Sequence, residues 1–81
     1  MRIVWDEPKR LTNLHKRRLD FASLPLEFFA DAMVVPTRLG RFKAVWWFDG
    51  EPTTVIFKPL GTEALSVISM RYASRKERKL L

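Results

Sequence analysis

A β-hairpin pattern in the middle of the chain constrains the fold more than any other feature. Residues 41–48, RFKAVWWF, alternate between two sets of side chains, as a half-buried strand does. Asp49-Gly50 follows, and this dipeptide is typical of a two-residue hairpin turn. Residues 53–58, TTVIFK, then supply the return strand. The sequence therefore predicts a pair of antiparallel strands on which the rest of the chain packs.

The two faces of the first hairpin strand differ in chemistry. One face carries the apolar side chains Phe42, Ala44, Trp46 and Phe48. The other carries Arg41, Lys43, Val45 and Trp47. We expect helices to cover the apolar face and to leave the cationic face open. Such a face can bind phosphates through its cations and stack bases on its Trp. An ordinary solvated sheet face with one partly buried Trp explains the same pattern equally well.

Further elements are predicted on both sides of the hairpin. A short strand at 2–5 leads into a helix that begins at Asp6, and a second short helix starts near Ser23. Residues 32–38 form a strand that ends at Pro36. After the hairpin come another strand, over 64–71, and a short helix. The order β-α-α-β-β-β-β-α predicts an α+β fold with an N-terminal strand, two helices, an antiparallel meander sheet and a short C-terminal helix.

Periodicity also predicts which side chains share a face in the flanking elements. In the first helix these are Leu11, Leu14 and Arg18. In the second helix they are Leu24, Phe28 and Ala32. In the last strand, one face would hold Ile68, Met70 and Tyr72, and the other Val67, Ser69 and Arg71.

Positive charge gathers in three blocks along the chain. The net charge is +6 over 81 residues. Residues 1–20 carry six basic and three acidic side chains, residues 38–48 three basic and no acidic ones, and residues 71–81 five basic and one acidic. Such blocks suit a polyanion or an acidic protein as the partner. They also occur on ordinary soluble surfaces.

The last basic block combines a fold signal with surplus cations. Ser74 and Glu77 have the spacing of a capping box, so a short helix is predicted to begin there. The four cations that surround Glu77 are Arg75, Lys76, Arg78 and Lys79. The capping box does not need them, although basic residues do favour a helix C-terminus. A binding role and this structural role explain them equally well.

Several kinds of chemistry find no support in the sequence. The chain has no cysteine, one histidine (His15) and three glycines, so no thiolate metal site, histidine cluster or glycine-rich phosphate loop is expected. No apolar stretch approaches the ~20 residues of a membrane span. We expect residues 1–81 to form a single domain of a soluble cytoplasmic protein, without a cofactor or metal.

Two motifs carry a family resemblance. The first is VWDEPKRLTNLHKRRLDF, with Trp5-Asp6, Lys9, Asn13, Lys16 and Asp20-Phe21. The second comprises Arg41-Phe42, Gly50 and the run ISMRYASRKER at 68–78. Both resemble the BrnT family, the toxin half of a bacterial type II toxin–antitoxin pair with a fold related to the RelE ribonucleases. The chain departs from that pattern at 16–18, where the family has Lys-His-Gly, and at 58–60, where it has Thr-x-Arg.

The resemblance implies an endoribonuclease that needs no metal and inhibits translation when free. A BrnA-type antitoxin would neutralise it, and operator DNA would be bound only through that antitoxin. The predicted catalytic residues are Arg41, Lys43, Arg71 and Tyr72. Arg41 and Arg71 would stabilise charge on the phosphate, and Lys43 or Tyr72 would move the proton. The predicted RNA-binding residues are Trp47, Arg75, Lys76, Arg78 and Lys79.

A second hypothesis fits the charge distribution without catalysis. The chain would then be a basic interaction domain that binds an acidic protein or nucleic acid and cleaves nothing. Expression without a partner separates the two hypotheses, because only the enzyme would stop growth and fragment RNA.

Overall fold

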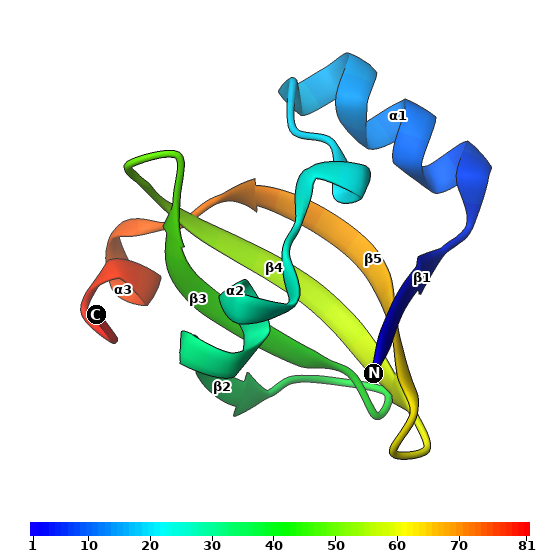
Figure 1. Ribbon diagram of the computed structural model, residues 1–81. Coiled ribbons are helices and arrows are strands. Elements are labelled where there is room, and N and C mark those ends of the chain that lie inside the picture. The colour runs from blue at the N-terminus through cyan, green and yellow to red at the C-terminus, as the bar shows by residue number, and fades with distance from the viewer.

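The computed structural model describes all 81 residues, and its element order is the predicted one with a 3₁₀ turn added (Figure 1). The elements are β1 (Arg2–Trp5), α1 (Glu7–Arg17), η1 (Phe21–Ser23), α2 (Leu26–Asp31), β2 (Met33–Pro36), β3 (Phe42–Phe48), β4 (Glu51–Leu60), β5 (Ala64–Tyr72) and α3 (Arg75–Arg78). The predicted α+β class is therefore confirmed. No helix is long and apolar enough to cross a membrane.

The five strands form one mixed sheet in the order β1-β5-β4-β3-β2. Strands β2 to β5 are an antiparallel meander, as predicted, and the Asp49-Gly50 turn joins β3 to β4. Strand β1 adds to the far edge of the sheet in parallel with β5, where Trp5 lies opposite Val67. A parallel pair needs a long connection, and here the connection includes α1, η1, α2 and strands β2 to β4.

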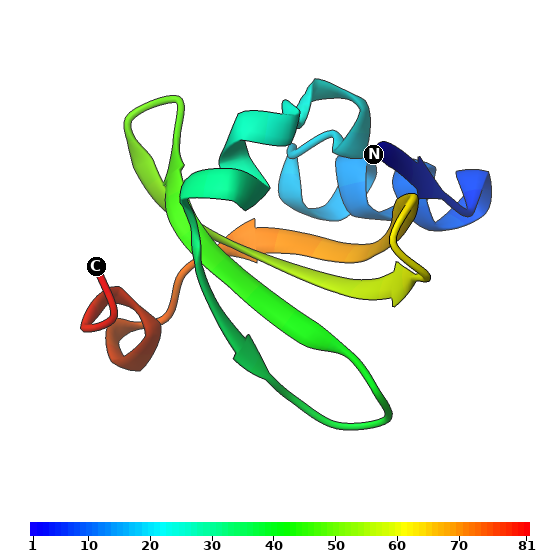
Figure 2. The same ribbon diagram turned by 60° about the horizontal axis from the view of Figure 1, so that its bottom comes forward.

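The core lies between the apolar face of the sheet and the segment that contains η1 and α2 (Figure 2). Phe21, Val55 and Met70 are fully buried there. The ring of Phe29 meets Phe28 and Phe57 edge to face, each at 5.4 Å between centroids. Ala44 is buried, and the other apolar side chains of its face in β3 pack against the same core. The predicted apolar face of β3 is confirmed.

A β-bulge in β5 changes the predicted faces of Val67 and Ile68, whereas Met70 and Tyr72 share one face and Ser69 and Arg71 the other, as predicted. Ile56 pairs with Ser69, but its neighbour Phe57 pairs with Val67, so Ile68 has no partner in β4. The extra residue reverses the alternation, because side chains in a strand point to opposite faces in turn. Val67 and Met70 consequently both enter the core, although the sequence pattern placed them on opposite faces.

Helix α1 docks on the sheet through a polar residue, which corrects the predicted apolar face. Leu11 is 52% exposed, whereas Asn13 is 8% exposed. The Asn13 side chain donates to the Leu19 carbonyl at 2.9 Å and accepts from the Met70 N–H at 3.1 Å. Strand β1 ends before it reaches Met70, so this N–H at the edge of β5 needs another partner. Asn13 supplies that partner.

The ends of the first two helices depend on local contacts that differ from the predicted ones. Asp6 is the N-cap of α1, but its side chain makes no capping hydrogen bond. Glu7 instead accepts from Trp5 Nε1 at 2.9 Å and from Arg10, and Arg10 lowers the pKa of Glu7 to about 2. Arg18 ends α1 in the left-handed region at φ 60°. Helix α2 begins after Pro25, because Ser23 belongs to η1.

We predict that Asn13→Ala lowers the free energy of unfolding by about 2–3 kcal/mol, because two buried backbone groups lose their partner. Urea denaturation of the purified protein measures this change. Leu11→Ala on the same helix is the control and should cost less than about 0.5 kcal/mol, since Leu11 is exposed. Similar losses for the two variants would contradict the anchoring role of Asn13.

Candidate active site

A buried carboxylate binds two cations on the sheet face that lies opposite the apolar core, which we call the second sheet face. Glu77 in α3 is 5% exposed. Its two oxygens accept from Arg71 Nη1 and Nη2 at 2.7 and 2.8 Å. Lys43 Nζ donates at 3.0 Å and Thr54 Oγ1 at 2.9 Å. The backbone N–H of Ser74 donates at 2.9 Å. One side chain thus ties together three strands and a helix.

The strand register explains why these groups meet. Arg71 in β5 lies opposite Thr54 in β4, which lies opposite Val45 in β3. Lys43 is two residues from Val45, so its side chain emerges on the same face. The predicted capping box of α3 is confirmed and directs Glu77 toward this face, because Ser74 Oγ accepts from the Glu77 N–H at 3.1 Å.

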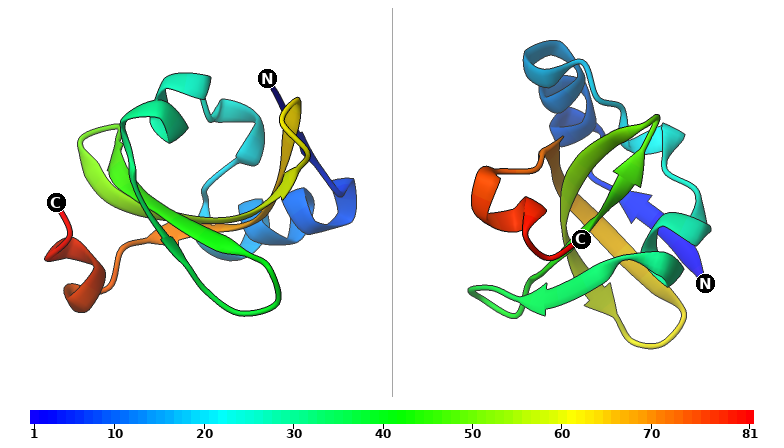
Figure 3. Two further views of the ribbon diagram at one scale, coloured as in Figure 1. Left: turned by 90° about the horizontal axis from the view of Figure 1, so that it is seen from below. Right: turned by 90° about the vertical axis from the view of Figure 1, so that its left-hand side faces the viewer.

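Helix α3 therefore covers part of the second sheet face, which was predicted to be open. In the edge-on view, α2 lies on one side of the sheet and α3 on the other (Figure 3). Val45 and Thr54 are fully buried on the α3 side. The prediction failed because the contacts of Glu77 with Lys43 and Thr54, which hold α3 against this face, join residues 34 and 23 positions apart in the sequence.

The ion pairs set the protonation of the site. Hydrogen bonds from Arg71 hold the pKa of Glu77 well below its usual range, and Ser74, Lys43 and Thr54 add to the effect. Glu77 in turn raises the pKa of Arg71. An ionised carboxylate that already accepts five hydrogen bonds is a poor proton acceptor and has no proton to give. Glu77 is thus a positioning group for the two cations.

Both cations keep access to solvent and N–H groups to spare. The side chain of Arg71 is 28% exposed and that of Lys43 is 30% exposed. A guanidinium has five N–H donors and an ammonium has three, so Glu77 occupies only part of each set. An anion that approaches this face can bind both residues at once.

Arg41 lies on the same face but at a distance from Arg71. It precedes β3 and lines a hollow of about 310 Å³ with Ile56, the cross-strand partner of Lys43. Arg71 lies in the same cross-strand row as Val45. Arg41 is four positions before Val45, so it lies about 13 Å from that row along the strand. Arg41 flanks the pair of cations without joining it.

Tyr72 does not lie on the sheet face that carries Lys43 and Arg71. Side chains alternate along β5, so Tyr72 faces the side opposite Arg71. Its ring is 54% exposed beside a hollow that Phe48 and Asp49 also line. Among the predicted catalytic residues, the structure brings together only Lys43 and Arg71.

The predicted RNA-binding residues surround that pair. Trp47 lies four residues beyond Lys43 on the same face of β3 and is 51% exposed. The basic side chains around α3 are exposed and form no ion pair with an acidic residue: Arg75, Lys76, Arg78 and Lys79. They extend the positive charge beyond the site on the side where α3 lies.

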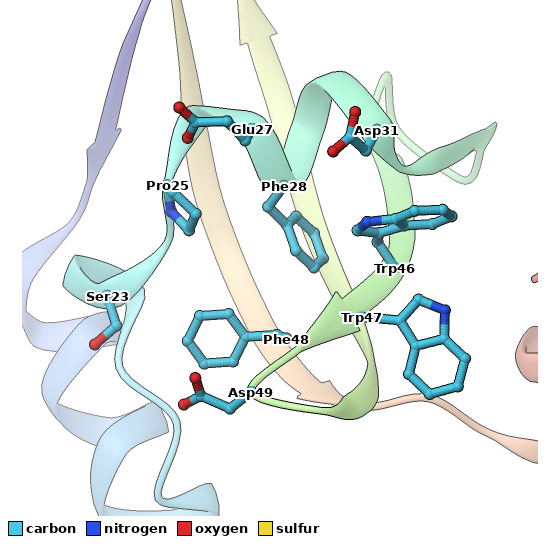
Figure 4. A pocket seen from close by; sticks show the side chains of 9 residues that line it. All are labelled: Ser23, Pro25, Glu27, Phe28, Asp31, Trp46, Trp47, Phe48 and Asp49. Carbon is cyan, nitrogen blue, oxygen red and sulfur yellow. The ribbon is translucent and has the colours of Figure 1, made fainter.

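The most voluminous hollow of the molecule lies elsewhere and suits a different ligand. It measures about 450 Å³ and lies between α2 and the end of β3 (Figure 4). Three carboxylates border it, those of Glu27, Asp31 and Asp49, together with Phe28 and the aromatic side chains of residues 46–48. Carboxylates repel phosphate, so this hollow is unsuitable for a nucleic-acid backbone.

Sequence reasoning missed the roles of Glu77 and Thr54 in the site. The capping box fully accounted for Glu77, and nothing local marked Thr54. The one available signal was that Glu77 is the single acidic residue in a terminal block with five cations. No group of three His, Cys, Asp or Glu side chains comes together in a way that could hold a metal ion.

Fold and site together define a small basic α+β protein in which one buried carboxylate holds a lysine and an arginine side by side. The profile of the family described as ribonuclease toxin, BrnT, of type II toxin–antitoxin system matches residues 5–77. The crystal structure of the Brucella abortus ribonuclease toxin BrnT is similar, with 58% sequence identity and a TM-score of 0.86. The match covers 93% of this chain and 99% of that one. No curated protein matches the chain.

The chain belongs to the BrnT family of ribonuclease toxins of type II toxin–antitoxin systems. This confirms the family resemblance of the two sequence motifs. Membership of a type II system implies a cognate antitoxin for this toxin.

We predict that Glu77→Gln lowers the free energy of unfolding at pH 7 by about 2–4 kcal/mol, because two partly buried cations lose their counter-charge. The folded-state pKa of Glu77 is depressed, so its contribution is complete above the unfolded value, near 4.5, and is lost as the pH falls below it. Urea denaturation between pH 7 and pH 2 should therefore show a smaller acid-induced loss in Glu77→Gln than in the wild type.

Glu63→Gln is the matched control, since Glu63 is exposed and forms no ion pair. It should follow the wild-type pH profile. Some acid dependence remains in both variants, because Asp20 and Glu7 also have lowered pKa values. A Glu77→Gln protein with wild-type stability at pH 7 would contradict the role of this carboxylate.

Proposed function

We propose that the chain cleaves RNA internally, by attack of a ribose 2′-hydroxyl on the adjacent phosphate, at the face where Lys43 and Arg71 meet. The observation that carries this proposal is the convergence of both cations on one carboxylate at 2.7 to 3.0 Å. A guanidinium fork beside an ammonium is a suitable receptor for a phosphate group. Glu77 holds the two cations in place while part of their donors stay free.

The two cations would divide the work of the reaction. As the 2′-oxygen bonds to phosphorus, negative charge builds on the non-bridging oxygens, and Arg71 neutralises it. The bond from phosphorus to the 5′-oxygen then breaks, and the ammonium of Lys43 gives that oxygen a proton. The 2′-hydroxyl proton passes to solvent. The products are a 2′,3′-cyclic phosphate and a 5′-hydroxyl, so the atoms and charges balance.

Neighbouring residues would hold the rest of the strand. Trp47 is exposed on the face of Lys43 and offers a ring on which a base can stack. The exposed cations around α3 attract further phosphates, and Arg41 provides a contact beyond Lys43. The reaction uses no metal in this proposal.

Family membership supports a proposal for the setting of the activity. We propose that residues 1–81 act as one domain that inhibits translation in the bacterial cytoplasm. We also propose that the cognate antitoxin is of the BrnA type and that operator DNA is reached only through it. Coexpression with such an antitoxin should restore growth, and continued growth arrest in the presence of the folded complex would contradict this pairing.

We predict that Lys43→Ala and Arg71→Ala each reduce the rate of RNA cleavage by at least about 100-fold, because each removes charge stabilisation or proton donation at the phosphate. Gel analysis of a labelled RNA measures the rate, and EDTA should not alter it. A substrate with a single 2′-deoxy sugar at the cleaved position should stay intact.

Lys58→Ala is the control, since Lys58 is an exposed cation of β4 that makes no ion pair. It should retain cleavage within about threefold. Because Arg71→Ala leaves Glu77 without its main partner, the double variant Arg71→Ala/Glu77→Gln tests activity without that buried charge. Wild-type cleavage by a folded Lys43→Ala protein and by this double variant would refute the site. Binding of RNA without any cleavage by the wild type would favour the non-catalytic hypothesis.

A further inference from the structure

The N-terminal family motif forms a cationic hollow that the cleavage site does not use. Lys9, Asn13 and Lys16 follow one another at spacings of four and three residues, so they share one side of α1. They line a hollow of about 390 Å³ with Thr12 and Arg17, and Pro8 and Ile68 complete its wall. We call this the α1 hollow. No acidic side chain lines it.

The cations of the α1 hollow have no acidic partners. Lys9, Lys16 and Arg17 are exposed and take part in no ion pair. Arg10 on the same helix shows the contrast, since it pairs with Glu7 at 2.7 Å and with Asp20 at 3.1 Å. Glu7 and Asp20 are therefore engaged with Arg10, and Asp6 does not line the α1 hollow, so its lining carries positive charge alone.

The α1 hollow lies next to the proposed cleavage site. Ile68, the bulge residue of β5, lines the hollow. Arg71 is three residues further along that strand, about 10 Å away. The bulge leaves Ile68 out of the core, and Ser69 beside it belongs to the row of Lys43. Asn13 binds the Met70 N–H at 3.1 Å and so keeps α1 in a constant position relative to this strand.

On these grounds, and resting on the proposed function, we propose that the α1 hollow binds the phosphodiester backbone of the RNA adjacent to the cleaved bond. Lysines spaced along about 10 Å of helix can reach more than one phosphate, and the Thr12 hydroxyl can donate to another oxygen. Of the seven residues that line the hollow, Ile68 is the one hydrophobic residue, and Lys9, Lys16 and Arg17 are cationic. A polyanion fits such a surface better than a protein segment does, since protein interfaces have an apolar centre.

The test is the salt dependence of binding to a single-stranded RNA with 2′-O-methyl groups, which the proposed reaction cannot cleave. For Lys9→Gln/Lys16→Gln, the log–log slope should be shallower by about 1.4, which corresponds to two lost phosphate contacts. Affinity at about 0.1 M salt should fall by about 10- to 30-fold. Lys9→Arg/Lys16→Arg should restore the slope, because it keeps both charges.

Arg18→Asn is the matched control. It removes one cation beside Tyr72 on the other side of the sheet, and Asn is well tolerated at the positive φ of this position. Its slope should equal that of the wild type. Circular dichroism and the melting temperature confirm that each variant is folded.

Two outcomes would overturn the inference. One is an unchanged slope in the folded Lys9→Gln/Lys16→Gln protein. The other is loss of affinity for the antitoxin with unchanged RNA binding, which would assign the α1 hollow to the partner protein. Failure of the proposed function has a separate signature, since cleavage of unmodified RNA would then persist without Lys43 and Arg71.

Discussion

The carboxylate of Glu77 is the interaction on which the functional half of this molecule depends. A short helix has little intrinsic stability, and α3 has only four residues. Its attachment rests on one side chain that accepts five hydrogen bonds from β3, β4, β5 and its own N-terminus. The same bonds bring Lys43 and Arg71 together. The attachment of α3 and the meeting of Lys43 and Arg71 are thus products of one contact.

The acidic residues also determine where positive charge remains available. Glu7 and Asp20 neutralise Arg10, which fastens the start of α1 to the turn before η1. Three further carboxylates border the hollow beside α2. The net charge of +6 is consequently not spread evenly, because no acidic side chain lines the α1 hollow and the exposed cations around α3 form no ion pair. The RNA proposed here would follow the surface from which the carboxylates are missing.

Local patterns predicted the parts of the fold that local forces decide. The hairpin at Asp49-Gly50 and the capping box at Ser74 were recovered because turn and cap chemistry act over a few residues. The bulge at Ile68 and the burial of Asn13 were missed. The bulge depends on how β5 pairs with β4, and Asn13 is buried because it binds the Met70 N–H, 57 residues away. In the site, motif and alternation pointed to Lys43 and Arg71, but they did not predict that both would bind Glu77. An ionic contact across 34 residues leaves no periodic trace in the sequence.

The parallel pairing of β1 with β5 has a consequence during synthesis. The register sets Trp5 opposite Val67, so the earliest strand cannot find its neighbour until more than 60 further residues have left the ribosome. At roughly 5–20 residues per second this delay lasts about 3–12 s. Until then the nascent chain lacks the β1–β5 pair, and it also lacks Arg71, the arginine proposed for cleavage. Because this pair forms last, the sheet gains its β1 edge only after the meander has been synthesised.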